Sequence, residues 1–100
     1  AVDDRRYAEA LVLMRLASGK GVESVIPEIE ELGIDPEALD SLAEYRAGGE
    51  EADVERALSL LARRPPRAKN QRDAAFRKLV QQGFGSSTAA AAARRWAEGR

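Results

Sequence analysis

Basic side chains gather in one stretch of the second half of the chain. Between residues 63 and 78 the only carboxylate is Asp73, whereas the cations are Arg63, Arg64, Arg67, Lys69, Arg72, Arg77 and Lys78. Such a cluster can bind phosphates with release of counterions, which makes the affinity salt-dependent, or it can bind an acidic protein surface. It can equally be a solvated helix face that other parts of the chain neutralise. The sequence leaves these alternatives open.

Carboxylates gather earlier in the chain, at Glu23, Glu28, Glu30, Glu31 and Asp35. Glu28 and Glu31 are three residues apart and share a helix face, so they could be read as a pair for acid–base catalysis. No apolar pocket or nucleophile accompanies them, and exposed Glu side chains usually form solvated helix surface. The alternation of oxygen ligands around a Gly that a calcium loop needs is missing as well. We interpret this cluster as surface.

The residue types that carry most enzyme chemistry are missing. The chain has neither Cys nor His, which removes disulfides, thiolate ligands and the usual zinc donors, together with the commonest general base at neutral pH. The glycine pairs match no phosphate-binding loop, and we interpret them as helix stops. We therefore predict no catalytic residue, no cofactor, no metal site and no small-molecule substrate, and a protein that is not an enzyme.

The net charge of −1 hides two oppositely charged halves. Residues 1–50 carry five Lys/Arg against twelve Asp/Glu, and residues 51–100 carry eleven against five. The two halves must therefore present different electrostatic surfaces to a partner. No apolar run approaches the roughly 20 residues that cross a bilayer and no secretory signal begins the chain, so we expect a cytoplasmic protein without membrane contact.

Helices must position these charges, because apolar residues recur at helical spacing and never alternate as in strands. Glycines, prolines and capping residues predict six helices, over residues 3–17, 22–32, 35–47, 50–64, 67–82 and 86–96. Pro27 either starts the second helix or kinks it. Ser86–Ser87 is expected to cap the last helix, and Trp96 either covers an Ala-rich core or anchors an interface. The residues expected to face inward are Tyr7, Ala10, Leu11, Met14, Val22, Val25, Ile26, Ile29, Leu32, Ala38, Leu39, Leu42, Tyr45, Val54, Ala57, Leu58, Leu61, Phe76, Leu79 and Val80.

When the sequence is shifted by 50 residues, glycine helix stops and apolar positions of the first half coincide with those of the second half. Gly33-Ile34 falls on Gly83-Phe84 and Ile29 falls on Leu79, while Ile26 falls on Phe76 and Leu11 on Leu61. Each half then reads as a long helix, a second helix and a short helix, and stacking lets such units bury faces that neither buries alone. The predicted fold is all-α, with two tandem three-helix repeats, residues 1–49 and 50–100, stacked into an elongated right- or left-handed helical array.

The segment from Asp4 to Arg15 has an acidic start, an Arg-aromatic-Ala step at Arg6–Ala8, an apolar pair and a later Arg. It resembles the middle repeat of the RecX regulatory proteins. The similarity continues in register through Gly19-Lys20-Gly21, Val25, Glu28, Ile29 and Gly33-Ile34, and the stretch from Phe76 to Phe84 resembles the last repeat of that family.

The resemblance implies a regulator that binds the groove of the RecA–DNA filament and curbs ATP hydrolysis and strand exchange. Because the family usually has three repeats, it leaves open a first repeat upstream of residue 1. The expected contact residues are Arg6, Arg15 and the basic stretch from Arg63 to Lys78. Two alternatives remain: a DNA-binding helical module that uses only the basic second half, and a helical protein-interaction domain unrelated to RecA.

Overall fold

The computed structural model describes residues 4–99, so the predicted helix start at Asp3 lies outside the described residues. The described residues form six α-helices and one 3-10 turn, with no strand among them, which confirms the all-helical prediction. In chain order these are α1 (Asp4–Ala17), α2 (Val22–Glu31), the 3-10 turn η1 (Pro36–Ala38), α3 (Asp40–Ala47), α4 (Gly49–Arg63), α5 (Gln71–Gln81) and α6 (Ser86–Glu98).

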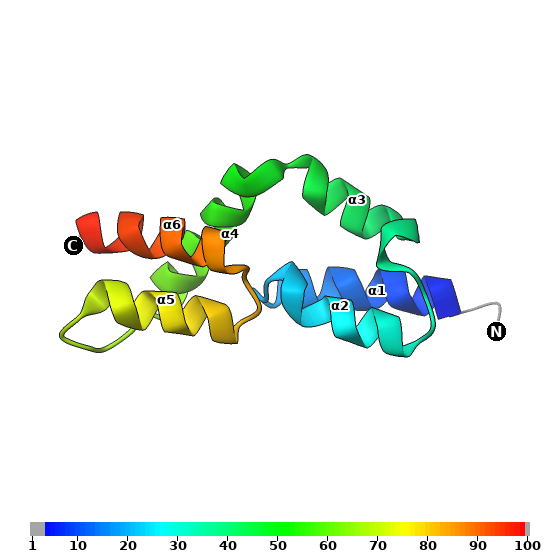
Figure 1. Cartoon of the computed structure of the whole chain (residues 1–100), viewed down its shortest axis with the longest axis horizontal. Helices are drawn as coiled ribbons and strands as arrows, with labels where there is room; N and C mark the ends of the chain where they lie inside the picture. The colour runs from blue at the N-terminus through cyan, green and yellow to red at the C-terminus, as the bar shows by residue number, and fades with distance from the viewer. Residues whose placement is uncertain (1–3, 100) are drawn as a thin grey trace.

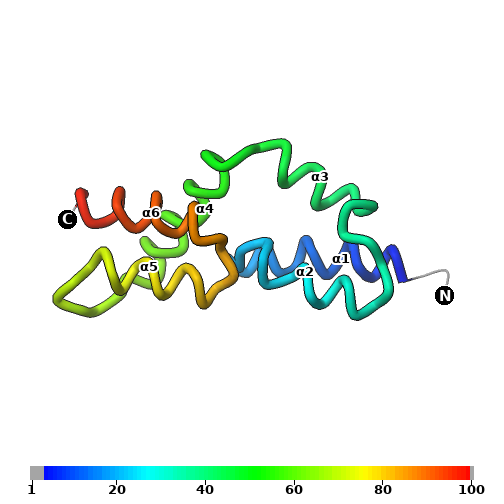
Figure 2. The backbone as a smooth tube through the Cα atoms, viewed as in Figure 1, coloured from blue at the N-terminus to red at the C-terminus, as the bar shows by residue number. Residues whose placement is uncertain are grey.

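The molecule is elongated, with principal extents of 50 × 22 × 19 Å. Helices α1, α2 and α3 occupy one half and α4, α5 and α6 occupy the other, so that the start of α1 and the end of α6 lie far apart (Figures 1 and 2). The chain passes from one half to the other only once, where Gly48 joins α3 to α4. Residues 4–47 are called the N-terminal half below, and residues 49–99 the C-terminal half.

Each half buries a hydrophobic cluster of its own. The cluster in the N-terminal half consists of Ala8, Leu11, Val12, Val25, Ile29, Leu39 and Leu42. The cluster in the C-terminal half consists of Val54, Ala57, Leu60, Leu61, Ala75, Leu79, Phe84, Ala89, Ala92 and Ala93. The alanines of α6 let this helix pack closely against α4 and α5, and Trp96 packs partly buried against the same cluster.

The second helix of each half ends in the same way. Gly33 and Gly83 have φ angles of +78° and +99°, which glycine adopts without steric cost. The amide of Gly33 donates to Glu30, and the amide of Ile34 to Ile29; Gly83 and Phe84 repeat this pair of bonds to Val80 and Leu79. This is the Schellman arrangement, and it confirms the two predicted glycine stops.

Helix α2 runs continuously through Pro27, so the interpretation that the helix begins near this proline is wrong. The first residue of α2 is Val22, and Pro27 lies one and a half turns further along. A proline there removes one hydrogen bond of the helix. The buried side chains of Val25 and Ile29 on either side of Pro27 hold this stretch in the core.

Two predicted helix starts and one predicted helix cap were wrong. Asp35 does cap a turn, accepting from the amide of Glu37, but this turn is the 3-10 segment η1 and α3 begins only at Asp40. Leu39 between them is extended and buried, whereas Ala38, which was expected to face inward, is exposed. Helix α5 begins at Gln71 rather than residue 67. Helix α6 begins at Ser86 as predicted, but its N-cap residue is Gly85 rather than a serine.

The buried face of α1 also differs from the predicted one. The side chains buried against α2 and α3 are Ala8, Leu11 and Val12. Tyr7 and Met14, which were expected to face inward, are 57% and 55% exposed, and Ala10 is exposed as well. Val80 of α5 is likewise exposed. Helix α1 therefore carries two apolar arcs, and only one of them is covered.

Candidate functional site

The basic stretch of the sequence follows the end of α4 and the beginning of α5. Arg63 closes the last turn of α4, where a cation is favoured by the helix dipole. Pro65 and Pro66 follow and prevent the helix from continuing. The chain then runs irregularly to Asn70, whose side chain accepts from the amide of Asp73 at 3.0 Å and starts α5. This connection lies at the tip of the C-terminal half (Figure 1).

Six of the seven cations in this stretch have no hydrogen-bond or ion-pair partner within residues 4–99. They are called the basic surface below: Arg63, Arg64, Arg67, Lys69, Arg72 and Lys78. The seventh, Arg77, pairs with Asp73 one turn earlier on α5. The basic surface is exposed except at Lys78, which is half-buried. Its charges are therefore available to an anionic partner.

A hollow between α5 and α6 borders the basic surface at Arg72. Its lining combines the apolar side chains of Phe76, Ala90 and Ala93 with the polar side chains of Asn70, Arg72 and Asp73. No nucleophile or general base lies in this lining apart from the carboxylate of Asp73, which already binds Arg77. The hollow can accept an apolar side chain beside a cation, and it offers no catalytic group.

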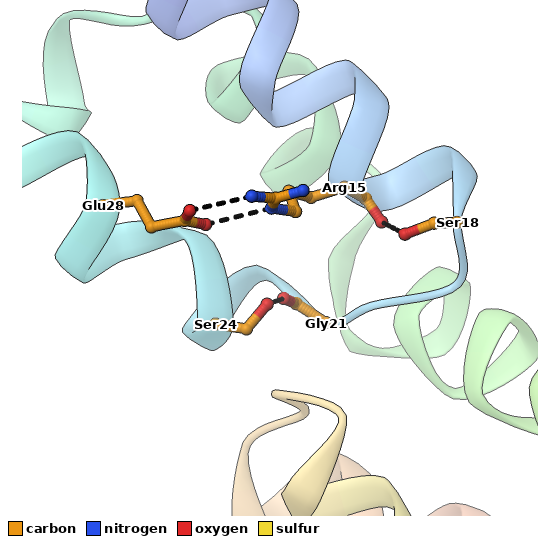
Figure 3. A network of polar contacts seen from close by, with 5 residues as sticks. All are labelled: Arg15, Ser18, Gly21, Ser24 and Glu28. Carbon is orange, nitrogen blue, oxygen red and sulfur yellow. Dashed lines mark hydrogen bonds and ion pairs between the residues drawn. The ribbon is translucent and has the colours of Figure 1, made fainter.

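Arg15, an expected contact residue, is engaged within the protein (Figure 3). Its guanidinium forms two hydrogen bonds with the carboxylate of Glu28, Nε to Oε2 at 3.1 Å and Nη2 to Oε1 at 2.9 Å. These bonds lower the pKa of the Glu28 carboxyl and keep it ionised. The pair joins α1 to α2, so Arg15 holds the N-terminal half together.

Arg6, the other expected contact residue outside the basic stretch, is exposed on α1. Within residues 4–99 no acceptor binds its side chain. Arg6 lies on α1 in the N-terminal half, whereas all residues of the basic surface belong to the C-terminal half. The predicted binding residues therefore do not form one continuous surface.

The residue that sequence reasoning missed is Arg56 of α4. Its guanidinium donates to the carbonyl oxygens of Leu16 at 2.6 Å and Lys20 at 3.1 Å, at the end of α1. It also donates to the hydroxyl of Tyr45 and lies over the rings of Tyr45 and Phe84, 5.2 and 5.9 Å from their centroids. Arg56 thus satisfies carbonyls that a helix end leaves unpaired and connects the two halves. No sequence pattern indicates this role, because Arg6, which the 50-residue shift aligns with Arg56, has no partner among residues 4–99.

A second set of contacts joins the halves beside Arg56. The amide of Gly21 donates to the carbonyl of Gln82, and the amide of Glu23 donates to that of Gly83, both at 2.9 Å. The first residues of α2 are thereby paired with the C-terminal end of α5. Gly19 lies close to Leu60 and Arg63 of α4. This contact region between the turn 19–21 and the C-terminal half is called the junction below.

Asp53 is a mostly buried carboxylate close to the junction. Burial raises its pKa, although a hydrogen bond with Thr88 and the charge of Arg56 act in the opposite direction. Its Oδ1 lies 3.8 Å from Arg56 Nη1 and accepts no hydrogen bond. Conversely, burial lowers the pKa of Arg56, which nonetheless stays charged because a guanidinium titrates far above neutral pH.

The remaining chemistry predicted from the sequence concerns metals and membranes. Within residues 4–99 no three Asp or Glu side chains gather closely enough to hold a metal ion. None of the helices of this part of the chain combines the length and the apolar character needed to cross a bilayer.

The site and fold together define an all-helical protein with two small cores, one junction and a free basic surface. Compared with known proteins, the sequence matches no protein-family model and no curated protein at a significant level.

Proposed function

We propose that this chain is a RecX-like regulatory protein that binds the RecA filament on DNA and reduces its activity. The proposal is supported by the structural role of residues on which the resemblance rests: several of them are buried in the hydrophobic clusters or form the junction. Ala8, Ile29, Leu79 and Phe84 are buried in the two hydrophobic clusters. Gly21 and Gly83 build the junction. Several positions of the motif are therefore ones on which this fold depends, whereas Arg6 and Tyr7 of the same motif are exposed.

The proposal includes two tandem three-helix repeats, residues 1–49 and 50–100, stacked into an elongated array. Equivalent positions supporting it play equivalent parts: Leu11 and Leu61 are buried in their clusters, as are Ile29 and Leu79. Gly33 and Gly83 end their helices with the same pair of hydrogen bonds. Core and stop positions agree together in the second helix of each half, which supports a repeat. In the first helices Leu11 and Leu61 agree, whereas Tyr7 is exposed and its partner in the shift, Ala57, is buried.

The proposed action is occupation of the filament groove without catalysis. An elongated helical body can follow a groove, and the basic surface provides charges for the DNA backbone or for an acidic face of the recombinase. Arg63, Arg64, Arg67, Lys69, Arg72 and Lys78 are the proposed contacts, together with Arg6. Arg15 and Arg77, the other two residues predicted to contact a partner, are paired with Glu28 and Asp73 and contribute by stabilising the fold. The site of action is then the cytoplasm, where RecA filaments form.

The test is an ATPase assay of RecA on single-stranded DNA with this protein titrated in, combined with a measurement of binding to the filament. We expect ATP hydrolysis to fall as the filament becomes saturated. The triple variant Arg67→Glu/Lys69→Glu/Arg72→Glu should bind at least about tenfold more weakly, which corresponds to about 1.4 kcal/mol. Arg94→Glu is the matched control, because Arg94 is an exposed cation of α6 outside the basic surface.

The proposal is contradicted if stoichiometric protein does not bind the filament and leaves ATP hydrolysis unchanged. If the triple variant inhibits RecA as strongly as the unmodified protein, the basic surface does not contribute to the proposed function.

A second candidate function is binding to DNA alone, and the unpaired state of the basic surface favours it. Each phosphate neutralised contributes about 0.9 to the slope of log affinity against log salt concentration. Six cations therefore allow a slope of at most about 5 for duplex DNA. Binding to bare DNA as tight as binding to the filament, with a slope in this range, would favour the DNA-binding module over the RecA regulator.

A further inference from the structure

The hollow between α5 and α6 is large enough to hold a bulky side chain. Its volume is about 400 Å³, near the small end of the range of roughly 300–1,000 Å³ that ligand pockets occupy. The half-buried ring of Phe76 lines it together with the methyl groups of Ala90 and Ala93. Ala90 is exposed, so the hollow is open to solvent on the side of α6. An apolar side chain of a partner can enter from there.

Helix α5 continues the apolar lining beyond the hollow. Arg72, Phe76 and Val80 follow one another at intervals of four residues, so they share one face of α5. Val80 is 44% exposed although it is a large apolar residue. Together with the hollow it forms a continuous apolar patch that begins beside a cation. Such a patch is typical of an interaction surface.

The charge around the hollow is positive. Arg72 belongs to the lining, is exposed, and binds no acceptor within residues 4–99. Asp73 is the only carboxylate of the lining, and its ion pair with Arg77 neutralises it. Arg67 and Lys69, two further cations of the basic surface, lie in the connection that precedes α5. The complementary ligand therefore carries negative charges on both sides of an apolar group.

A nucleic acid base fits this lining less well than an apolar side chain does. A base has a polar edge, and each of its N–H donors needs an acceptor inside the hollow. The side-chain oxygen of Asn70 already accepts from the amide of Asp73, and the carboxylate of Asp73 already binds Arg77. The donors of a base would therefore compete with bonds that the protein makes itself. An apolar side chain leaves no polar group unpaired.

We propose that the hollow between α5 and α6 binds an acidic peptide segment of another protein through one apolar anchor residue. The anchor lies against Phe76 and Ala90, and the carboxylates on either side of it pair with Arg72 and the neighbouring cations of the basic surface. This inference goes beyond the proposed function, because the chemistry of the peptide defines the partner and neither RecA nor DNA takes part.

The test measures binding of a fluorescein-labelled peptide to the full chain by fluorescence anisotropy. The peptide has one phenylalanine between two runs of three glutamates. A peptide with alanine in place of the phenylalanine should bind at least about tenfold more weakly, because it loses the burial of a large apolar side chain.

Two protein variants separate the anchor from the charge. Ala90→Gln fills the hollow without changing the charge and should remove the preference for phenylalanine over alanine in the peptide. Ala43→Gln, at an exposed alanine of α3, is its matched control and should retain the preference. Arg72→Gln should weaken the binding of both peptides by up to about fivefold, because an exposed ion pair contributes little. Lys20→Gln removes an equal charge in the N-terminal half and should leave both affinities nearly unchanged.

Three results would overturn the proposal. One is the absence of detectable binding of the phenylalanine peptide, and another is equal affinity for the phenylalanine and alanine peptides. The third is a single-stranded oligothymidylate that displaces the peptide and binds more weakly to Ala90→Gln than to Ala43→Gln, which would assign the hollow to nucleic acid. Circular dichroism checks that the variants fold. Because these measurements contain no recombinase, their failure is distinct from a failure of RecA binding.

Discussion

Gly21 and Gly83 meet backbone to backbone across the junction, although they belong to different halves of the chain. A Cβ atom on Gly21 would lie 2.4 Å from the carbonyl oxygen of Gly83, and one on Gly83 would lie 2.4 Å from the Cβ of Ser24. The absence of side chains lets the amides of Gly21 and Glu23 reach carbonyls of the other half. This close approach fixes how the two halves sit against each other.

Gly21→Ala should destabilise the protein through this contact alone. The backbone of Gly21 has φ −81°, which any residue adopts, so the substitution introduces no backbone strain there. Overpacking of this kind costs about 1–3 kcal/mol, and urea denaturation measures it. Gly85→Ala is the matched control, because Gly85 also precedes a helix with ordinary φ but a Cβ there meets nothing within 4 Å. Equal costs for the two variants would contradict the description of the junction.

Arg56→Met should weaken the connection between the halves. The variant keeps much of the apolar stem but loses the hydrogen bonds to the carbonyls of Leu16 and Lys20. A hydrogen bond from a charged donor contributes about 1.5–3 kcal/mol, so we expect a loss within this range in the free energy of unfolding. Arg56→Lys should restore only part of it, because an ammonium lacks the planar fork and stacks poorly. A loss no greater than that of Arg94→Met would show that Arg56 does not join the halves.

Asp53 should make stability depend on pH in the direction opposite to most carboxylates. Burial raises its pKa above the ordinary value of 3.8 in the folded state, so the folded protein holds this proton more tightly than the unfolded chain does. The stability gained from this is fully present below pH 3.8 and is lost as the pH rises through the raised value.

Asp53→Asn removes the titrating group, so the difference in stability between the unmodified chain and this variant reports the titration of Asp53. The free energy of unfolding of the unmodified chain, minus that of Asp53→Asn, should fall as the pH rises from below the ordinary value. Urea denaturation of both proteins between about pH 3 and 7 measures the difference, and this interval spans the ordinary pKa of Asp. A difference that stays constant, or that rises with pH, would contradict a raised pKa.

The two apolar arcs of α1 should respond differently to truncation. Leu11→Ala removes a side chain buried among α2 and α3 and should cost about 2–4 kcal/mol. Met14→Ala removes one that is 55% exposed and should change the free energy of unfolding by less than about 0.5 kcal/mol. Thermal or urea denaturation compares them. A larger cost for Met14→Ala would mean that the predicted inward stripe, rather than the observed one, faces the core.

Local chemistry explains where sequence reasoning succeeded. Gly33 and Gly83 end their helices because glycine adopts a positive φ without steric cost, and Pro65–Pro66 ends α4 because proline lacks the helical amide. The start of α5 at Gln71 was missed although Asn70 is a common capping residue. The prolines at 65 and 66 were taken as the only break, and the irregular stretch that follows them was read as helix.

The sequence by itself determined that the chain is helical and where most of its helices stop, because these choices are made within a few residues by backbone sterics and hydrogen-bonding groups. Only the tertiary structure decided which arc of α1 is buried, that Arg15 is held by Glu28 while Arg6 has no partner among residues 4–99, and that Arg56 joins the halves. Burial and pairing depend on which element lies opposite a side chain. Spacing along the chain does not specify this, since both arcs of α1 have the same helical period.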